Sequence, residues 1–224
     1  MSDGDPAAEP GLADRLKRIE QIENELIRKC AGVMGQGTNL SHADFFVVGA
    51  VRRTLAQARG FRDLIGARNF PCAAAILRLQ MDTAMRVNAL ALVGDPDAAC
   101  KAVLDGEQFN RLTDGSGRKM SDAYLRGRLA EGHPWINPVY ERTSDFVHLS
   151  GRHFEVSIAR TDDASRLAQF QISGHDPERP DEAYFEVVDT FFETTRLAGM
   201  LMLGFLMARH QRDELLASTK EEEK

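Results

Sequence analysis

AGMLMLGFLMA, residues 198–208, is the most apolar run in the chain, and it decides where the longest helix must lie. Asp189, Glu193 and Arg196 precede this run. The eleven residues of the run are too few to span a bilayer, which takes about 20. We therefore expect a helix over 184–216 whose middle is apolar nearly all round. Such a helix belongs at the centre of a helical bundle.

Hydrophobic periodicity predicts further helices on the N-terminal side of this one. Apolar residues recur at helical spacing over 12–34, with charges on the opposite face. Ser41 or Asn39 can cap a second helix that runs to about Ala67. A third helix follows Asn69, has a proline in its first turn and continues to about Val93. Shorter helices are predicted over three segments: 97–104, 121–131 and one that begins at Pro138.

The pattern changes after Gly151. HFEVSIA and LAQFQIS alternate apolar and polar residues, and the polar segment TDDASR joins them, which predicts a small β-hairpin at about 154–173. The fold class that follows is mainly α, a helical bundle with a small β-hairpin inserted before the last long helix. We expect residues 9–216 to form a single helical domain, with 1–8 and 217–224 as disordered ends.

Composition narrows the classes of function. The net charge of −6 over 224 residues argues against bulk attraction to nucleic acid. The three cysteines, Cys30, Cys72 and Cys100, form no CxxC pair, so we expect reduced, mostly buried thiols and no metal or other cofactor. GSGRKMS lacks the spacing of a phosphate-binding loop. The polar N-terminus contains no signal peptide, so we expect a cytoplasmic protein with no membrane contact.

The densest group of titratable residues is YERTSDFVHLSGRH, residues 140–153. On a continuous helix, Tyr140, Ser144 and His148 would line one face, with Asp145 beside them. A carboxylate next to a histidine raises its pKa and fixes its orientation. A serine hydrolase is disfavoured because there is no nucleophile elbow, and the histidines match no standard metal spacing.

A charged stripe marks the third predicted helix. Arg78, Asp82 and Arg86 follow one another at four-residue intervals, which places them on one face of an otherwise apolar helix. Two interpretations stay open. Asp82 orients the two arginines toward a phosphate or carboxylate in a polar groove, or the three residues form a surface ladder that satisfies itself.

Arginine is also concentrated locally. Residues 52–86 contain seven arginines and only two aspartates, although the whole chain has a net charge of −6. This surface suits an RNA backbone, because arginine matches phosphate geometry. Pairing with the acidic first helix is the alternative interpretation.

Arg142 and His148 are separated by five residues, and this spacing resembles the R-x(4–6)-H motif of the HEPN superfamily. The surrounding sequence, from about residue 45 to 155 together with the final helix, is similar to uncharacterised bacterial all-helical proteins grouped near that superfamily. The resemblance implies an RNA- or nucleotide-binding protein, with metal-independent endoribonuclease activity in defence or stress. His148 would be the general acid or base at a ribose 2′-hydroxyl, and Arg142 would stabilise the phosphorane.

The substrate-binding residues expected around this pair come from both polar regions: Arg78, Asp82, Arg86, Ser144, Asp145, Arg152 and His153. We also expect a homodimer, because the Phe- and Met-rich helices leave apolar surface to bury. The resemblance implies that two subunits can bring together Arg142 and His148, which diverge on a single helix. Two alternatives remain open. One is a non-catalytic helical module that docks a protein partner. The other is a small-molecule sensor in which Trp135 and Tyr140 wall an apolar pocket.

Overall fold

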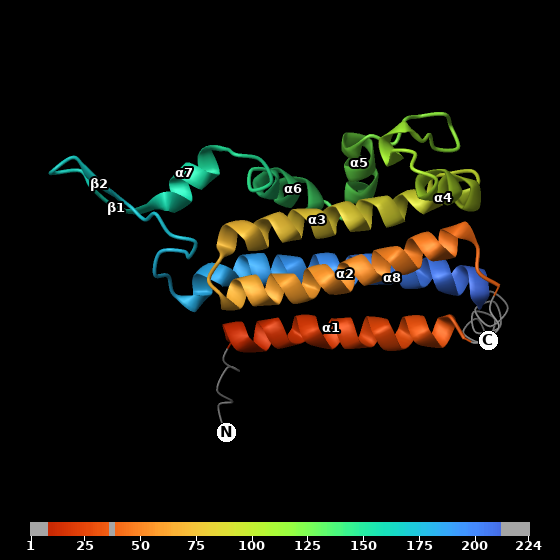
Figure 1. Ribbon diagram of the computed structural model, residues 1–224, viewed down its shortest axis with the longest axis horizontal. Helices are drawn as coiled ribbons and strands as arrows, with labels where there is room; N and C mark the ends of the chain where they lie inside the picture. Colours follow the sequence, from red (N-terminus) through yellow and green to blue (C-terminus); the bar gives the residue numbers. More distant parts are fainter. Residues whose placement is uncertain (1–8, 36–38, 212–224) are drawn as a thin grey trace, which may run out of the picture.

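Four long helices lie side by side in the computed structural model, which describes residues 9–35 and 39–211. They are α1 (Leu12–Val33), α2 (His42–Gly66), α3 (Phe70–Asn88) and α8 (Phe185–His210), and Figure 1 shows them stacked with nearly parallel axes. The expected mainly α bundle, with a two-stranded hairpin before the last long helix, is confirmed.

The core lies between these four helices. α8 packs against α1, α2 and α3, and Ile19, Phe61, Met81 and Phe191 are fully buried there. The rings of Phe61 and Phe191 stack with centroids 3.9 Å apart. Because α8 contributes ten buried residues on several faces, its apolar composition follows from its central position.

Segment 181–210 is the one part of the described chain that is long and apolar enough to cross a membrane. This apolar segment is longer than the run 198–208, which by itself is too short to span a bilayer. The core helix of a soluble protein passes the same test, and 44% of the window is buried inside the bundle. The packing of α8 on three neighbours therefore supports the core-helix interpretation.

Three shorter helices pack on the outside of this core. They are α4 (Pro96–Leu104), which lies against α2, and α5 (Asp122–Gly132) and α6 (Ile136–Ser144), which lie against α3. 3-10 turns at Ala89–Ala91 and Phe109–Arg111 precede α4 and α5. The Asp95 side chain caps α4 and the Ser121 side chain caps α5. The third helix, α3, ends at Asn88, before its predicted end at about Val93. A 3-10 turn at Ala89–Ala91 follows it.

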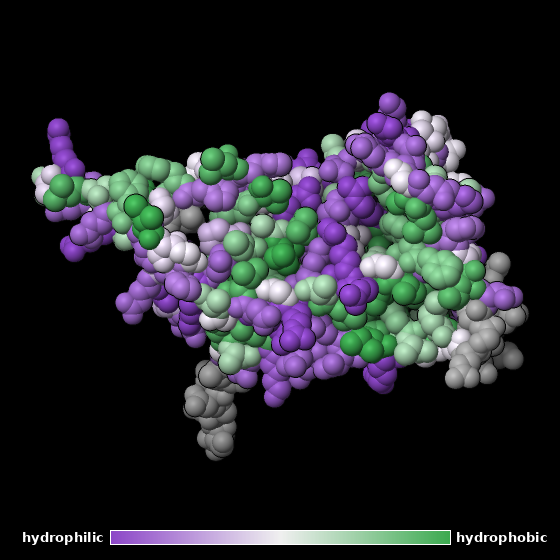
Figure 2. All heavy atoms as spheres, in the orientation of Figure 1, coloured by the Kyte–Doolittle hydropathy of each residue, from purple (hydrophilic) through white to green (hydrophobic). Residues whose placement is uncertain are grey.

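A narrow arm projects from one end of the bundle (Figure 1). It consists of α7 (Gly151–Ser157), β1 (Ile158–Asp162) and β2 (Leu167–Phe170), with the two strands antiparallel. A short 3-10 helix, Asp181–Tyr184, then leads into α8. Figure 2 shows apolar surface along this arm.

The predicted hairpin at about 154–173 was too long. Residues 154–157 belong to α7, where the Ser157 hydroxyl donates to the Phe154 carbonyl at 2.7 Å. Alternation alone does not separate a strand from a single helical turn. The four-residue loop that remains is held by Asp162, whose carboxylate accepts from the backbone N–H of Ala164 at 3.0 Å.

One further boundary differs from the sequence prediction, and another lies beyond the described residues. α6 ends at Ser144, so the continuous helix expected to align Tyr140, Ser144 and His148 is wrong. The chain tightens there, because the N–H of Phe146 donates to Thr143 and that of Val147 to Ser144. α8 is described to His210, and the predicted continuation to Leu216 lies outside the described residues, as do both predicted disordered ends.

Candidate functional site

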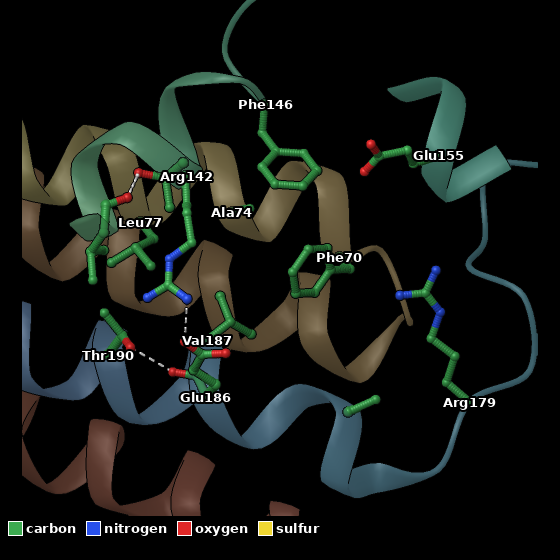
Figure 3. Close-up of a pocket in the computed structure, with 13 residues that line it drawn as sticks. Phe70, Ala74, Leu77, Arg142, Phe146, Glu155, Arg179, Glu186, Val187 and Thr190 are labelled. Atoms are coloured by element: carbon green, nitrogen blue, oxygen red, sulfur yellow. Dashed lines mark hydrogen bonds and ion pairs between the residues drawn. The ribbon is translucent and has the colours of Figure 1, made fainter. Parts of the chain in front are cut away.

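A cleft of about 330 Å³ opens where α3, α6 and the start of α8 meet. Its walls are apolar, and Figure 3 shows Phe70 of α3 and Phe146 of the segment after α6 side by side in its centre. Their rings meet edge to face with centroids 5.5 Å apart. Such a pair presents a ready-made aromatic surface, which suits a flat apolar ligand.

An arginine lies at each end of this aromatic surface (Figure 3). Arg142 extends from α6 on one side, and Arg179 extends from the segment before α8 on the other. Arg142 Nη1 is 2.8 Å from Glu186 Oε1. Within the described chain, Arg179 makes no hydrogen bond or ion pair. Because it is half-buried and unpaired, its guanidinium is available to an anion.

Two glutamates share the cleft with the arginines. Glu186 lies in the first turn of α8, and Glu155 comes from α7. The Arg142 and Glu186 side chains are 54% and 74% exposed, so their ion pair contributes little stability. A ligand anion can therefore exchange with Glu186 on Arg142. The Glu155 carboxylate can accept hydrogen bonds from donors on the same ligand.

His148 lies outside this constellation. It is exposed in the turn between α6 and α7, and the cleft is lined by its neighbour Phe146, two residues earlier. The residues that surround His148, Val147 and Leu149, are also exposed. In the described part of the chain no hydrogen bond orients the His148 ring, unlike His153, whose Nδ1 accepts from the Ser150 N–H at 3.3 Å.

Arg78 joins α3 to α6. Its guanidinium lies over the Tyr140 ring at 3.7 Å and donates to the Tyr140 hydroxyl, and its Nε lies 3.4 Å from the Ser144 hydroxyl. Arg126 of α5 lies near the same ring, 4.9 Å from its centroid. Tyr140 is thus held between two guanidinium groups and does not line the cleft, nor does Trp135.

Asp82 and Arg86 lie elsewhere on α3, beside a second cleft of about 340 Å³. Arg86 Nε donates to Asp82 at 2.9 Å and its Nη2 lies 3.2 Å from Asp122 of α5. Burial lowers the pKa of the Arg86 guanidinium, but the hydrogen bonds and negative charges of Asp82 and Asp122 together outweigh burial and raise that pKa. The charged stripe therefore divides into two parts. Arg78 binds Tyr140, whereas Asp82 and Arg86 pair with each other, as the surface-ladder interpretation predicts.

The remaining predicted residues have structural partners or lie outside the description. The Asp145 carbonyl accepts from the Ser150 hydroxyl at 2.8 Å, and its carboxylate is exposed. The His153 ring meets Phe146 at 5.9 Å. The Arg152 side chain lies outside the described part of the molecule. Of the eight predicted site residues whose side chains are described, Arg142 alone lines the main cleft.

The arginine-rich surface is partly explained by pairing with α1. Arg62 Nε donates to Glu23 of α1 at 2.9 Å, and its Nη1 lies 3.8 Å from Glu20. Arg53 donates to the Thr83 hydroxyl at 3.0 Å. For Arg62, the acidic first helix is therefore the partner.

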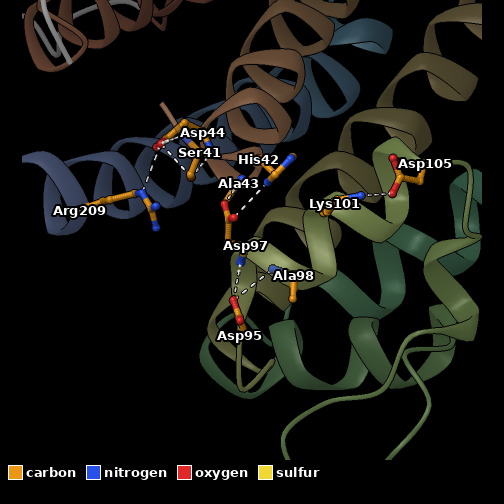
Figure 4. Close-up of polar contacts among 10 residues, drawn as sticks. All are labelled: Ser41, His42, Ala43, Asp44, Asp95, Asp97, Ala98, Lys101, Asp105 and Arg209. Carbon is orange, nitrogen blue, oxygen red and sulfur yellow. Dashed lines mark hydrogen bonds and ion pairs between the residues drawn. The ribbon is translucent and has the colours of Figure 1, made fainter. Parts of the chain in front are cut away.

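Sequence reasoning missed a polar cluster at the opposite end of the bundle, shown in Figure 4. The fully buried Asp44 carboxylate accepts from Arg209 Nε at 3.2 Å and lies 2.7 Å from His210 Nε2. Asp97 of α4 accepts from the Ala43 N–H at 3.0 Å and lies 3.0 Å from His42 Nδ1. The signal was the capping box formed by Ser41 and Asp44, which marks the start of α2.

Hydrogen bonds set the ionisation of both carboxyls. Burial raises the pKa of Asp44, but hydrogen bonds from the Ser41 backbone and from His210 outweigh it and hold that pKa below its ordinary value. The hydrogen bond from His42 and the one from the Ala43 backbone hold the pKa of Asp97 well below the usual range. Both groups stay charged and fully partnered, so this cluster fastens α2 to α4 and α8.

No protein-family model, curated protein or solved structure matches this chain. Among residues 9–35 and 39–211, no group of three His, Cys, Asp or Glu side chains could hold a metal ion.

Proposed function

We propose that the protein binds a nucleotide in the cleft between α3, α6 and α8. The observation that carries this proposal is the aromatic pair Phe70 and Phe146 with an arginine on either side. A base can stack on a phenyl ring, which is worth about 1 to 3 kcal/mol per base. An arginine binds phosphate through two parallel hydrogen bonds.

A nucleotide suits this cleft better than a simple fatty or aromatic acid does. The cleft offers arginines as donors and the Glu155 carboxylate as an acceptor. A nucleotide carries ribose hydroxyl and base amino donors as well as phosphate. The net charge of −6 also favours a mononucleotide or a short single strand over long duplex RNA.

Calorimetric titration with AMP, GMP, UMP and a single-stranded RNA hexamer tests the proposal. We expect binding that weakens by about 10- to 100-fold in Arg142→Ala, from the loss of a charge-assisted pair worth about 1.5 to 3 kcal/mol. Arg111→Ala is the matched control, because Arg111 is an exposed arginine whose partner is Glu107. Equal affinities in both variants, or no binding of any probe by the wild type, would contradict the proposal.

A second candidate function is metal-independent RNA cleavage. It rests on the exposure of His148 two residues beyond Phe146, where a strand held in the cleft could reach the ring. His148 would move the proton of a ribose 2′-hydroxyl, and Arg142 would stabilise the charge that develops on phosphorus. These are the two residues of the stretch that resembles the HEPN motif.

Incubation of total tRNA and a structured RNA with a chelator separates the two functions. If cleavage occurs, His148→Ala should abolish it while leaving the affinity for the RNA hexamer unchanged. Arg142→Ala should reduce both. An intact substrate with the wild-type protein would exclude the nuclease and leave nucleotide binding to be judged by titration alone.

A further inference from the structure

Large apolar side chains are exposed on the projecting arm and beside it. Leu149 is 94% exposed and Ile172 is fully exposed, and three more lie between them: Phe154 (60%), Leu167 (66%) and Phe170 (51%). Figures 1 and 2 show these segments standing clear of the bundle. Three of these residues lie on the arm and two flank it, and such a concentration of exposed apolar side chains is characteristic of a surface that is covered in the functional assembly.

The arm is also too small to be stable by itself. Its sheet has two strands, and a two-stranded hairpin is only marginally stable in water. The outer edge of β1 pairs with no strand in the described chain, so its backbone groups are open to another strand. One further strand paired with β1 would satisfy that edge.

The sequence of β1 identifies the strand that fits. Arg160, Thr161 and Asp162 lie in a row at this edge. When two copies of β1 pair antiparallel about Thr161, each Arg160 lies directly opposite the Asp162 of the other copy. Directly opposite residues share a face, and opposite charges there stabilise the pair by about 0.2 to 1 kcal/mol.

The same pairing extends the apolar face. Ile158 lies opposite Phe170 in the hairpin, and Phe170 lies 5.7 Å from Phe154 of α7. A two-fold axis through Thr161 keeps these residues on the same side in both copies. The four-stranded sheet would thus have one apolar face, with an α7 from each copy packed on it, which is the arrangement that small sheets need for stability.

We propose that this arm is a dimerisation element, in which β1 pairs antiparallel with β1 of a second copy about Thr161. The partner is another copy of this chain, because the charge pattern of β1 is complementary to itself. This inference is independent of the nucleotide proposal, since the cleft residues Arg142, Phe70 and Phe146 lie outside the strands.

Disulfide trapping in the full-length protein tests the register. Cys72 is exposed, whereas Cys30 is half-buried and Cys100 is buried with a pKa raised by burial to about 12, so Cys72→Ser gives a suitable background. In that background Thr161→Cys should form a covalent dimer under mild oxidation. Opposite Cα atoms lie about 4.5 to 5.5 Å apart, within the range that a disulfide spans.

Ala164→Cys is the matched control, because this residue is equally exposed in the hairpin loop. In the proposed register the two Ala164 positions are about 20 Å apart, so cross-linking should be at least tenfold slower. Equal cross-linking rates for the two variants would overturn the register.

The solution mass tests dimerisation itself. Light scattering coupled to size exclusion should give twice the mass of one chain for the wild type and for Arg160→Lys. Arg160→Glu, which faces Asp162 with a like charge, should shift the protein toward monomer while the helical bundle stays folded. A wild type that stays monomeric at about 100 µM, or a dimer that Arg160→Glu leaves intact, would overturn the proposal.

Discussion

The two ends of the bundle use the same kinds of side chain to opposite effect. At the end where α2 begins and α8 finishes, Asp44 is buried and every charge near it has a partner (Figure 4). At the other end, Arg142 and Arg179 lie beside an open aromatic cleft (Figure 3). A charge cluster that is fully partnered stabilises the fold, and one that is left open is available to a ligand.

The largest effect is expected at the closed end. Asp44→Ala leaves Arg209 and His210 without their buried acceptor and removes the capping box of α2. We expect the free energy of unfolding to fall by about 3 kcal/mol, measured by urea denaturation at pH 7. Nucleotide affinity should not change. Asp105→Ala, at an exposed residue paired with Lys101, is the control, and equal effects for both would contradict the assignment.

The stability that the Asp44 charge contributes should depend on pH. Because the folded pKa of Asp44 is below its unfolded value, its charge stabilises the fold above an unfolded pKa of about 4, and this contribution is lost as the pH falls through the folded pKa. Asp97 contributes with the same sign. The stability difference between wild type and Asp44→Asn should therefore be largest near pH 7 and shrink toward pH 2. A difference that does not change over that range would contradict this prediction.

At the open end, substitutions should change nucleotide affinity rather than stability. Phe146→Leu keeps an apolar wall but removes the aromatic ring that meets Phe70. We expect nucleotide affinity to fall about tenfold from the lost stacking, with a change in melting temperature of no more than a few degrees. Leu149→Ala, at a nearby exposed residue outside the cleft, should bind like the wild type. Unchanged nucleotide affinity in Phe146→Leu would show that the Phe146 ring does not contact the ligand.

A smaller change of the opposite sign is expected at Glu186. Glu186→Gln removes the carboxylate that competes with a ligand phosphate for Arg142. Affinity for AMP should therefore rise about threefold to tenfold, and the rise should shrink as salt screens the charges. Glu193→Gln, in the same helix and paired with Arg196 away from the cleft, should leave affinity unchanged. A loss of affinity in Glu186→Gln would show that Glu186 binds the ligand directly.

The smallest effect on stability is expected at His148. The ring is exposed and no hydrogen bond within the described chain holds it, so His148→Ala should change the free energy of unfolding by less than about 0.5 kcal/mol. Thermal melting measures this. A strong loss of stability would instead make His148 a structural residue of the turn.

The long helices of the bundle and their order were predictable from the sequence, because they depend on local periodicity and capping. Ser41 caps α2, Asn69 caps α3 and the apolar stretch of α8 is central, all as local chemistry indicates. The hairpin was found, but its start was misplaced, because alternation over 154–157 fits both a strand and a helical turn.

The site was far less predictable. The spacing of Arg78, Asp82 and Arg86 places them on one face, but their partners, Tyr140 and Asp122, come from α6 and α5. Arg179 and Phe70 carry no motif, and their distance of over a hundred residues along the chain hides their proximity. Among the predicted residues whose side chains are described, only Arg142 lines the cleft.

The sequence by itself therefore determined that this chain is a helical bundle with a buried final helix and a small hairpin. Hydrophobic periodicity acts over a few residues, and a single sequence displays it directly. The tertiary structure decided which charges are partnered and which remain open. That choice depends on which faces of distant helices meet, and it is what separates the closed cluster around Asp44 from the open cleft beside Arg142.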